Sequence, residues 1–234
     1  MDREEIIARY RAEYDALYHA LSGDEIGEVK RAALDAHART HPALVSGRSG
    51  ETLADRAFAA LKEGKKNLLV PRQIWDTDLH YAGTDRVPAV WLFWHIYRIE
   101  DLVSNILIAG KDQIFDKTWK ERIGSPITDT GNALTPEEAR TFGEGIDLDA
   151  LWAYMIAVGK NTRRVIGEMD MKDMRSMARE ETVMRILEEG GVTADFRSVW
   201  LLVFWGRLTG AEMILTPLTM HHLMHLPALT GEFI

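Results

Sequence analysis

Hydrophobic residues recur every three or four positions along most of the chain, which is the spacing of one face of an α-helix. The first such stretch covers residues 2–21, with apolar positions at Ile6, Tyr10, Tyr14, Leu17 and Leu21. A short second helix is predicted over Ala32–Ala38 and a third over about Thr52–Leu69. The segment Pro71–Gly83 is expected to connect this third helix to the next one.

The most regular helical pattern lies between Pro88 and Gly110. Proline suits the first turn of a helix because its missing amide hydrogen needs no partner there, and glycine favours the end of a helix. The positions that share one face of this predicted helix are Trp91, Leu92, His95, Ile99, Leu102 and Ile106. A long polar loop follows, and its residues 135–138 (Thr-Pro-Glu-Glu) have the pattern of a capping box at the start of another helix.

Two further helices and an interrupted apolar region complete the pattern. Asp147 or Asp149 can cap a long helix, and another helix is predicted over Met171–Glu189. The last apolar region, Val199–Leu229, contains four residues that interrupt helices, namely Gly206, Gly210, Pro217 and Pro227. No strand-like alternation or internal repeat stands out in the sequence, so the predicted fold class is all-α.

Composition narrows the kinds of protein that this chain can be. Of its 234 residues, 46% are hydrophobic and 27% charged, the balance of a globular domain with a sizeable core. The net charge is −8 and no long basic run is present, which argues against nucleic acid as a partner. The chain contains no cysteine, so a metal could bind only to His, Asp, Glu or water.

The chain carries no sign of export or of membrane insertion. Residues 1–5 are mostly charged and have no signal-peptide core. The most apolar stretch, Val87–Gly110, includes several ionisable side chains, so it is predicted to be a buried helix rather than a membrane span. The expected localisation is cytoplasmic, with no membrane partner.

The histidines are the strongest chemical signal. His221 and His225 are four residues apart, which on a helix places their Cβ atoms about 5–6 Å from each other on one face. Two such imidazoles can bind one ion, and Thr216 and Pro217 could cap and begin their helix. His95 can supply a third ligand if its helix is a neighbour. Three imidazoles leave a coordination position open, as in catalytic metal sites.

Simpler interpretations exist for each of these histidines. A lone histidine such as His95 on an apolar face is more often a hydrogen-bonded core residue, and one HxxxH pair is a weak signal. His222 lies about 100° around the helix from His221, so we expect it on the surface or supporting a ligand. The other histidines are interpreted as solvated or loop residues: His19, His37, His41 and His80.

Several neighbouring residues are candidates for the same site. Three tryptophans and an arginine are predicted to line its pocket: Trp91, Trp94, Trp205 and Arg98. Glu100 could orient a ligand histidine or act as a catalytic base, whereas the simpler interpretation is a surface or ion-paired carboxylate. The sequence has neither the HExxH motif of zincin proteases nor the Glu-x-x-His motif of ferritin-like di-iron bundles.

Several segments together resemble the DinB-like superfamily, named for DNA-damage-inducible proteins. Residues 94–102 (WHIYRIEDL) resemble its second bundle helix, and residues 119–124 with 131–138 resemble an inter-helix loop of one branch. Residues 151–162 resemble its third helix, and residues 221–226 (HHLMHL) the end of its fourth. The resemblance covers about residues 52–232. It implies a four-helix bundle over 51–234 with a long crossover connection, often dimeric, and leaves residues 1–50 as an N-terminal helical extension.

The same resemblance implies a divalent metal ion, commonly zinc or nickel, bound by residues that match His95, His221 and His225. Some members are transferases or isomerases that use a low-molecular-weight thiol. The leading hypothesis is therefore a metal-dependent, thiol-dependent transferase acting on an unknown small molecule, with a homodimer expected. The alternative is a non-catalytic metal- or ligand-binding bundle, and an activity on DNA is disfavoured by the acidic charge. Pro217 and Pro227 depart from the family pattern and are expected to shorten or kink the fourth helix.

Overall fold

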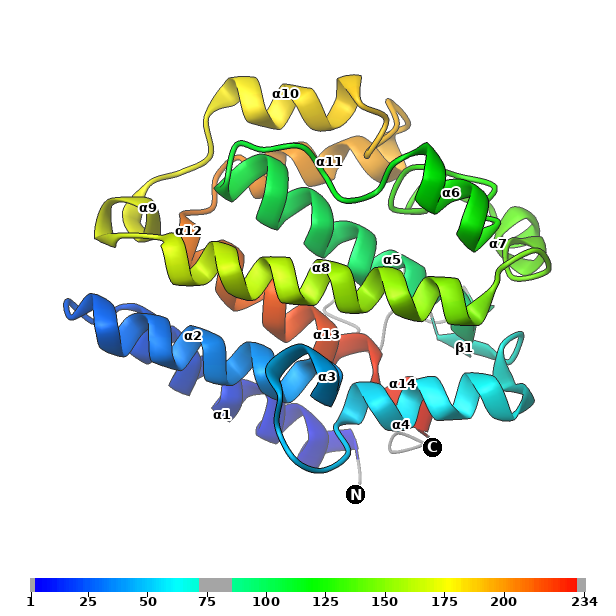
Figure 1. Cartoon of the computed structure of the whole chain (residues 1–234), viewed down its shortest axis with the longest axis horizontal. Helices are drawn as coiled ribbons and strands as arrows, with labels where there is room; N and C mark the ends of the chain where they lie inside the picture. The colour runs from blue at the N-terminus through cyan, green and yellow to red at the C-terminus, as the bar shows by residue number, and fades with distance from the viewer. Residues whose placement is uncertain (1–2, 72–85, 231–234) are drawn as a thin grey trace.

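The computed structural model describes residues 3–71 and 86–230, and helices dominate both segments (Figure 1). This confirms the predicted all-α class. The chain begins with α1 (Arg3–Leu21) and α2 (Ile26–Thr40), which pack against each other, followed by the short α3 (Ala43–Ser46). The second helix is longer than the predicted Ala32–Ala38, because its buried small residues extend the apolar face in both directions.

Helix α4 (Leu53–Ala60) begins at a capping box formed by Thr52 and Asp55, and it continues into the π-helical segment η1 (Leu61–Lys65). Strand β1 (Leu69–Pro71) then pairs antiparallel with β2 (Arg86–Pro88). The sequence shows no strand-like alternation at these positions. Each strand is only three residues long, too short for an alternating pattern to be visible. The predicted connecting loop lies almost entirely outside the described residues.

Helix α5 (Ala89–Asp101) and its π-helical continuation η2 (Leu102–Ile108) form the centre of the fold. Every side chain from Ala89 to Leu107 is buried. Residues of α5 pack with α4, α7 and α8 in one hydrophobic cluster, and residues of η2 pack with α1, α2 and α12 in a second. The apolar stripe found in the sequence therefore belongs to an element that is covered on all sides.

The long polar connection carries α6 (Lys117–Ile123) and α7 (Pro136–Phe142), and α7 has the predicted capping box of Thr135 and Glu138. Asp147 caps α8 (Leu148–Glu168), which lies alongside α5 and over α2 (Figure 1).

The predicted single helix over Met171–Glu189 is two helices, α9 (Met171–Arg175) and α10 (Glu180–Glu188). Between them the backbone turns aside, because Ser176 accepts a hydrogen bond from the amide of Gly210 and Met177 forms a β-bridge with Thr209. These partners are distant in sequence, so the helical periodicity could not reveal the break.

The C-terminal region begins with α11 (Phe196–Trp205). A continuous helical stretch follows, made of α12 (Gly210–Leu215), the π-helical η3 (Thr216–Met220) and α13 (His221–His225). The short α14 (Pro227–Thr230) comes last. The prediction that Thr216 and Pro217 begin the histidine-bearing helix was wrong. That stretch begins at Gly210, after a capping box of Thr209 and Glu212. Pro217 is accommodated in the π-helical segment, where the Thr219 hydroxyl lies 2.7 Å from the carbonyl oxygens of residues 214 and 215.

Across residues 3–71 and 86–230, no helix combines the length and the apolar character needed to cross a bilayer.

Candidate metal centre

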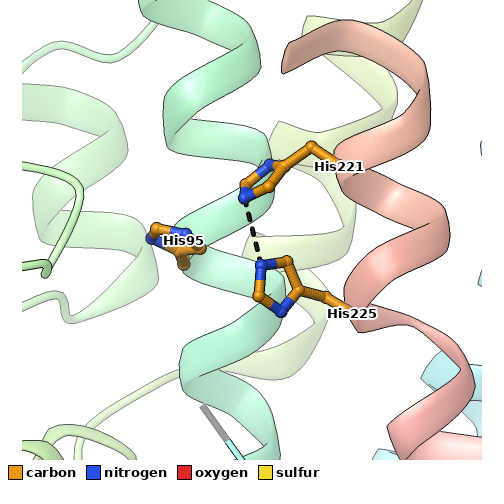
Figure 2. Close-up of side chains that lie close together, drawn as sticks. All are labelled: His95, His221 and His225. Carbon is orange, nitrogen blue, oxygen red and sulfur yellow. Dashed lines mark hydrogen bonds between the residues drawn. The ribbon is translucent and has the colours of Figure 1, made fainter. Parts of the chain in front are cut away.

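Three histidines converge where α5 meets α13 (Figure 2). His95 projects from α5, and His221 and His225 project from successive turns of α13. The ring of His95 lies 5.0 Å from that of His221 and 5.4 Å from that of His225, centroid to centroid. Each residue offers a nitrogen, and these three atoms lie within 4.8 Å of one another. The two helices are neighbours, which is the condition that sequence reasoning set for a three-histidine site.

The orientation of His95 suits a metal ligand. Its Nδ1 lies 3.0 Å from the carbonyl oxygen of Thr130. Because a carbonyl only accepts, Nδ1 carries the proton, and a neutral ring then has its lone pair on Nε2. Trp91 stacks on the imidazole with ring centroids 4.6 Å apart and fixes its plane. Metal-bound histidines usually donate their second nitrogen to a carbonyl or carboxylate in this way.

His221 and His225 present their Nε2 atoms to each other at 3.1 Å. Ligands of a tetrahedral ion with bonds of about 2.0–2.1 Å lie about 3.3 Å apart, so this spacing is close to the one that a shared ion requires. Burial lowers the pKa of both imidazoles well below the ordinary value, and the other histidines lower it further. Both rings are therefore neutral at pH 7, the protonation state in which histidine binds a metal.

A cavity of about 210 Å³ opens beside the three histidines. Its other lining residues are mostly aromatic or aliphatic: Trp91, Ile99, Asn132, Trp200, Leu201, Phe204, Trp205, Thr216, Pro217 and Met224. Trp200 and Phe204 are 47% and 38% exposed, so they stand at the mouth, whereas Trp205 is buried at its wall. The sequence analysis did not predict Trp200 and Phe204 as pocket residues. They are four positions apart, so they lie on the same face of α11, beside Leu201, which also lines the cavity.

Two predicted pocket residues lie elsewhere. Trp94 points into the core and donates its indole hydrogen to the carbonyl of Asp129. The Arg98 guanidinium is 1% exposed and donates to the Thr128 carbonyl and to the Asp101 carboxylate. Neither side chain lines the cavity. Arg98 therefore organises the long connection rather than meeting an anionic substrate.

Glu100 does not line the cavity beside the three histidines. The predicted surface position was wrong, whereas the carboxylate is paired, with histidines as its partners, and its role as a catalytic base stays a prediction. It is fully buried instead of exposed, and it contacts the histidines that were expected to be solvated. Its carboxylate lies 3.1 Å from His37 Nε2, 2.6 Å from His41 Nε2 and 3.2 Å from His222 Nε2. The first two contacts are hydrogen bonds, while the ring of His222 is not aligned for one.

Burial and mutual contact shift the pKa values of His37, His222 and Glu100 in this second cluster. Desolvation, together with a smaller effect of His41, lowers the pKa of His37 to about 3 and that of His222 to about 4. Burial alone would raise the pKa of Glu100, but His41 and the other two imidazoles hold it well below its ordinary value. The carboxylate of Glu100 is therefore ionised at pH 7, and the imidazoles of His37 and His222 are neutral.

A signal for the second cluster was present in the sequence. His37 and His41 are four residues apart, the same spacing as His221 and His225. The predicted helix ended at Ala38, which removed His41 from it, whereas α2 continues to Thr40. His19, by contrast, is exposed as expected, and His80 lies outside the described residues.

Neither the family models nor the curated proteins compared with this chain give a match. The candidate function therefore rests on the geometry of the site and on the sequence motifs.

Proposed function

We propose that this chain is a DinB-like metal-binding protein that holds one divalent ion, zinc or nickel, on His95, His221 and His225. Four helical stretches support the bundle assignment: α4 with η1, α5 with η2, α8, and α12 to α13. The long connection that carries α6 and α7 lies between the second and third of them. Residues 1–50 then form the extension, whose helices α1 and α2 pack on this bundle.

The observation that carries the proposal is the position of three imidazole nitrogens in the wall of an apolar cavity. Three protein ligands would leave room for a further ligand on a bound ion, and the same three histidines line the cavity. Such an ion supplies Lewis-acid chemistry, in which it lowers the pKa of a bound thiol or water and makes it nucleophilic near neutral pH. The protein's own part is to hold the ligand rings in place and to keep the surrounding space apolar.

The lining of the cavity defines a class of substrate. It is aromatic and aliphatic, with Asn132 and Thr216 as its polar side chains apart from the histidines. The volume of about 210 Å³ is below the roughly 300–1,000 Å³ of pockets for drug-sized ligands. The substrate class is therefore a small, uncharged and largely apolar molecule. In the transferase proposal, His95, His221 and His225 would hold the ion, and a low-molecular-weight thiol would be the co-substrate that the ion activates.

A second candidate is an ion that only binds and does not catalyse. The position of Glu100 favours it, because this carboxylate contacts another cluster and does not line the cavity. In that case the ion would tie α5 to α13. Removing the metal would then lower the melting temperature strongly, since metal binding is coupled to folding. A small change with an exchangeable ligand on the ion would favour the transferase.

The test is the metal content of protein purified without an affinity tag. We expect the three-histidine site to hold one equivalent of metal in wild type, and His95→Gln and His225→Gln to lose that equivalent. His19→Gln is the matched control, since His19 is exposed on α1. Retention of the full metal content by both ligand variants would overturn the proposal.

A further inference from the structure

The carboxylate of Glu100 is enclosed by imidazoles from two other helices. His37 belongs to α2, His41 follows the end of α2, and His222 belongs to α13. All four side chains have zero exposed area. A buried carboxylate needs compensation by a positive charge or by several donors, so the protonation of the rings decides what this cluster is.

The tautomer of His41 follows from its neighbours. Its Nδ1 lies 2.8 Å from the backbone carbonyl oxygen of His37, which only accepts hydrogen bonds. Nδ1 therefore carries a proton, and a neutral ring has a lone pair on Nε2. That lone pair lies 2.6 Å from Glu100 Oε2, which is itself an acceptor. Two acceptors cannot remain at this distance on their own: either a proton lies between them, or the two atoms move apart and bind a common metal ion.

His222 distinguishes these two cations. One proton shared by His41 and Glu100 leaves Nε2 of His222 3.2 Å from Glu100 without an aligned hydrogen bond, whereas Nδ1 of His222 has no partner among the described residues with either cation. Each buried polar group left unpaired costs about 1–3 kcal/mol. A metal ion beside Glu100 would instead bind the Nε2 lone pairs of His222, His37 and His41 together. The metal ion therefore accounts for more of the cluster than the proton does.

We propose that His37, His41, His222 and Glu100 form a second divalent-metal site of the zinc class, with each histidine bound through Nε2. The ligand atoms of His37, His41 and Glu100 already lie within 4.8 Å of one another. Tetrahedral ligands lie about 3.3 Å apart. The three Nε2–carboxylate distances are shorter than this by about 0.1 to 0.7 Å. The rings of His37 and His41 are also stacked, with centroids 3.5 Å apart and planes 10° from parallel, so the two rings must move outward and rotate apart for their Nε2 lone pairs to meet at one ion.

This second site is closed and structural. Four protein ligands complete a tetrahedron, as in structural zinc sites, and their complete burial leaves no position for a substrate. The ligands come from α2, α5 and α13, so the ion fastens the N-terminal helices to the helices that carry the three-histidine site. The inference stands independently of the proposed transferase, because none of these four residues lines the cavity.

The experiment uses the full chain without an affinity tag, stripped with a chelator and then saturated with Zn²⁺. We expect two bound equivalents per chain by elemental analysis. Crystals of this protein should show two anomalous peaks at the zinc edge, one beside His95 and one beside Glu100. A single peak beside His95, with one bound equivalent, would overturn the second site. A single peak beside Glu100 would leave it standing and remove the first.

Variants assign each equivalent to its site. We expect His41→Gln to lose one equivalent and keep the peak beside His95, and His95→Gln to show the reverse. His41→Gln protein that still binds two equivalents would contradict the assignment. If His41→Gln does not fold, ¹⁵N chemical shifts of zinc-saturated wild type decide the matter. A proton on His41 Nε2 under those conditions would establish the proton-sharing cluster and exclude the metal.

Discussion

His221 and His222 are consecutive residues of α13, yet their rings enter two different clusters. The ring of His221 lies 5.0 Å from that of His95, while the ring of His222 lies 4.3 Å from that of His41. Neighbouring residues of an α-helix point about 100° apart, so α13 presents one face to the cavity and another to α2. The pair should therefore respond differently to the same substitution.

Loss of a residue that only hydrogen-bonds to a metal ligand weakens metal binding by roughly 10–100-fold. Because His221→Gln removes a ligand itself, we expect it to weaken Zn²⁺ binding at the three-histidine site by more than this. Competition with a chromophoric chelator measures this. His222→Gln should leave the affinity of the three-histidine site within tenfold of wild type. Equal losses from the two variants at that site would contradict the division of α13 into two faces.

The sequence predicts the local features of this site better than its tertiary ones. The spacing of His221 and His225 and the apolar stripe around His95 are properties of single helices, and periodicity reveals them. The environment of Glu100 depends on α2 packing against η3 and on the ring of His41 meeting that of His222 in α13, which no local pattern encodes. The same limit applies to Arg98, whose partners come from a loop 30 residues away in sequence.

Helix ends account for most of the other differences. The predicted second helix ended at Ala38, so the spacing of four between His37 and His41 was not recognised as helical. Pro217 suggested the beginning of a new helix, whereas the structure has a π-helical continuation of an existing one there. Proline removes one hydrogen-bond donor, yet Pro217 stands at the start of the π-helical segment and the helix continues through it. Rules about proline alone do not predict such a continuation.

Gly131 supports His95 indirectly, which gives a test of the ligand's orientation. Its φ of +77° favours glycine, and an added Cβ would lie 2.5 Å from the Trp91 indole nitrogen. Trp91 stacks on His95, and Thr130, next to Gly131, accepts the His95 hydrogen bond. We expect Gly131→Ala to destabilise the fold by about 1–3 kcal/mol and to weaken Zn²⁺ binding about tenfold.

Chemical denaturation and chelator competition measure the two effects of Gly131→Ala. Gly167→Ala is the matched control, because Gly167 lies in α8 with open space around it and a helical backbone. Alanine should be neutral or stabilising there. Unchanged metal affinity in Gly131→Ala would show that the Thr130 contact does not hold His95 in place.

The aromatic mouth of the cavity is testable with an apolar thiol such as thiophenol. We expect this thiol to bind Co²⁺-loaded protein and to produce a sulfur-to-cobalt charge-transfer band. Phe204→Ser should weaken its binding about tenfold, since removing part of an aromatic contact costs on the order of 1.4 kcal/mol. Val203→Ser is the control, because Val203 is 57% exposed on the same helix and does not line the cavity. Equal effects of the two variants would argue against thiol binding at this mouth.

Tyr154 should make the protein sensitive to alkali. It is fully buried and donates a 2.7 Å hydrogen bond to Asp101, which also pairs with Arg98. Burial raises the pKa of Tyr154 well above its ordinary value, and the Asp101 charge raises it further. Above the unfolded-state pKa of about 10, the unfolded chain has lost this proton while the folded chain keeps it. Stability is therefore complete below pH 10 and declines as the pH rises beyond it.

The loss should approach about 1.4 kcal/mol per pH unit for this one group. Denaturant unfolding between pH 9 and 11 measures this loss of stability. We expect the stability of Tyr154→Phe to decline less steeply with pH. At pH 8 this variant should be less stable than wild type, because it lacks the hydrogen bond to Asp101. Tyr18→Phe serves as the control, since Tyr18 is 47% exposed on α1. If Tyr154→Phe and wild type lose stability in parallel above pH 10, the alkaline transition belongs to other groups and Tyr154 does not govern it.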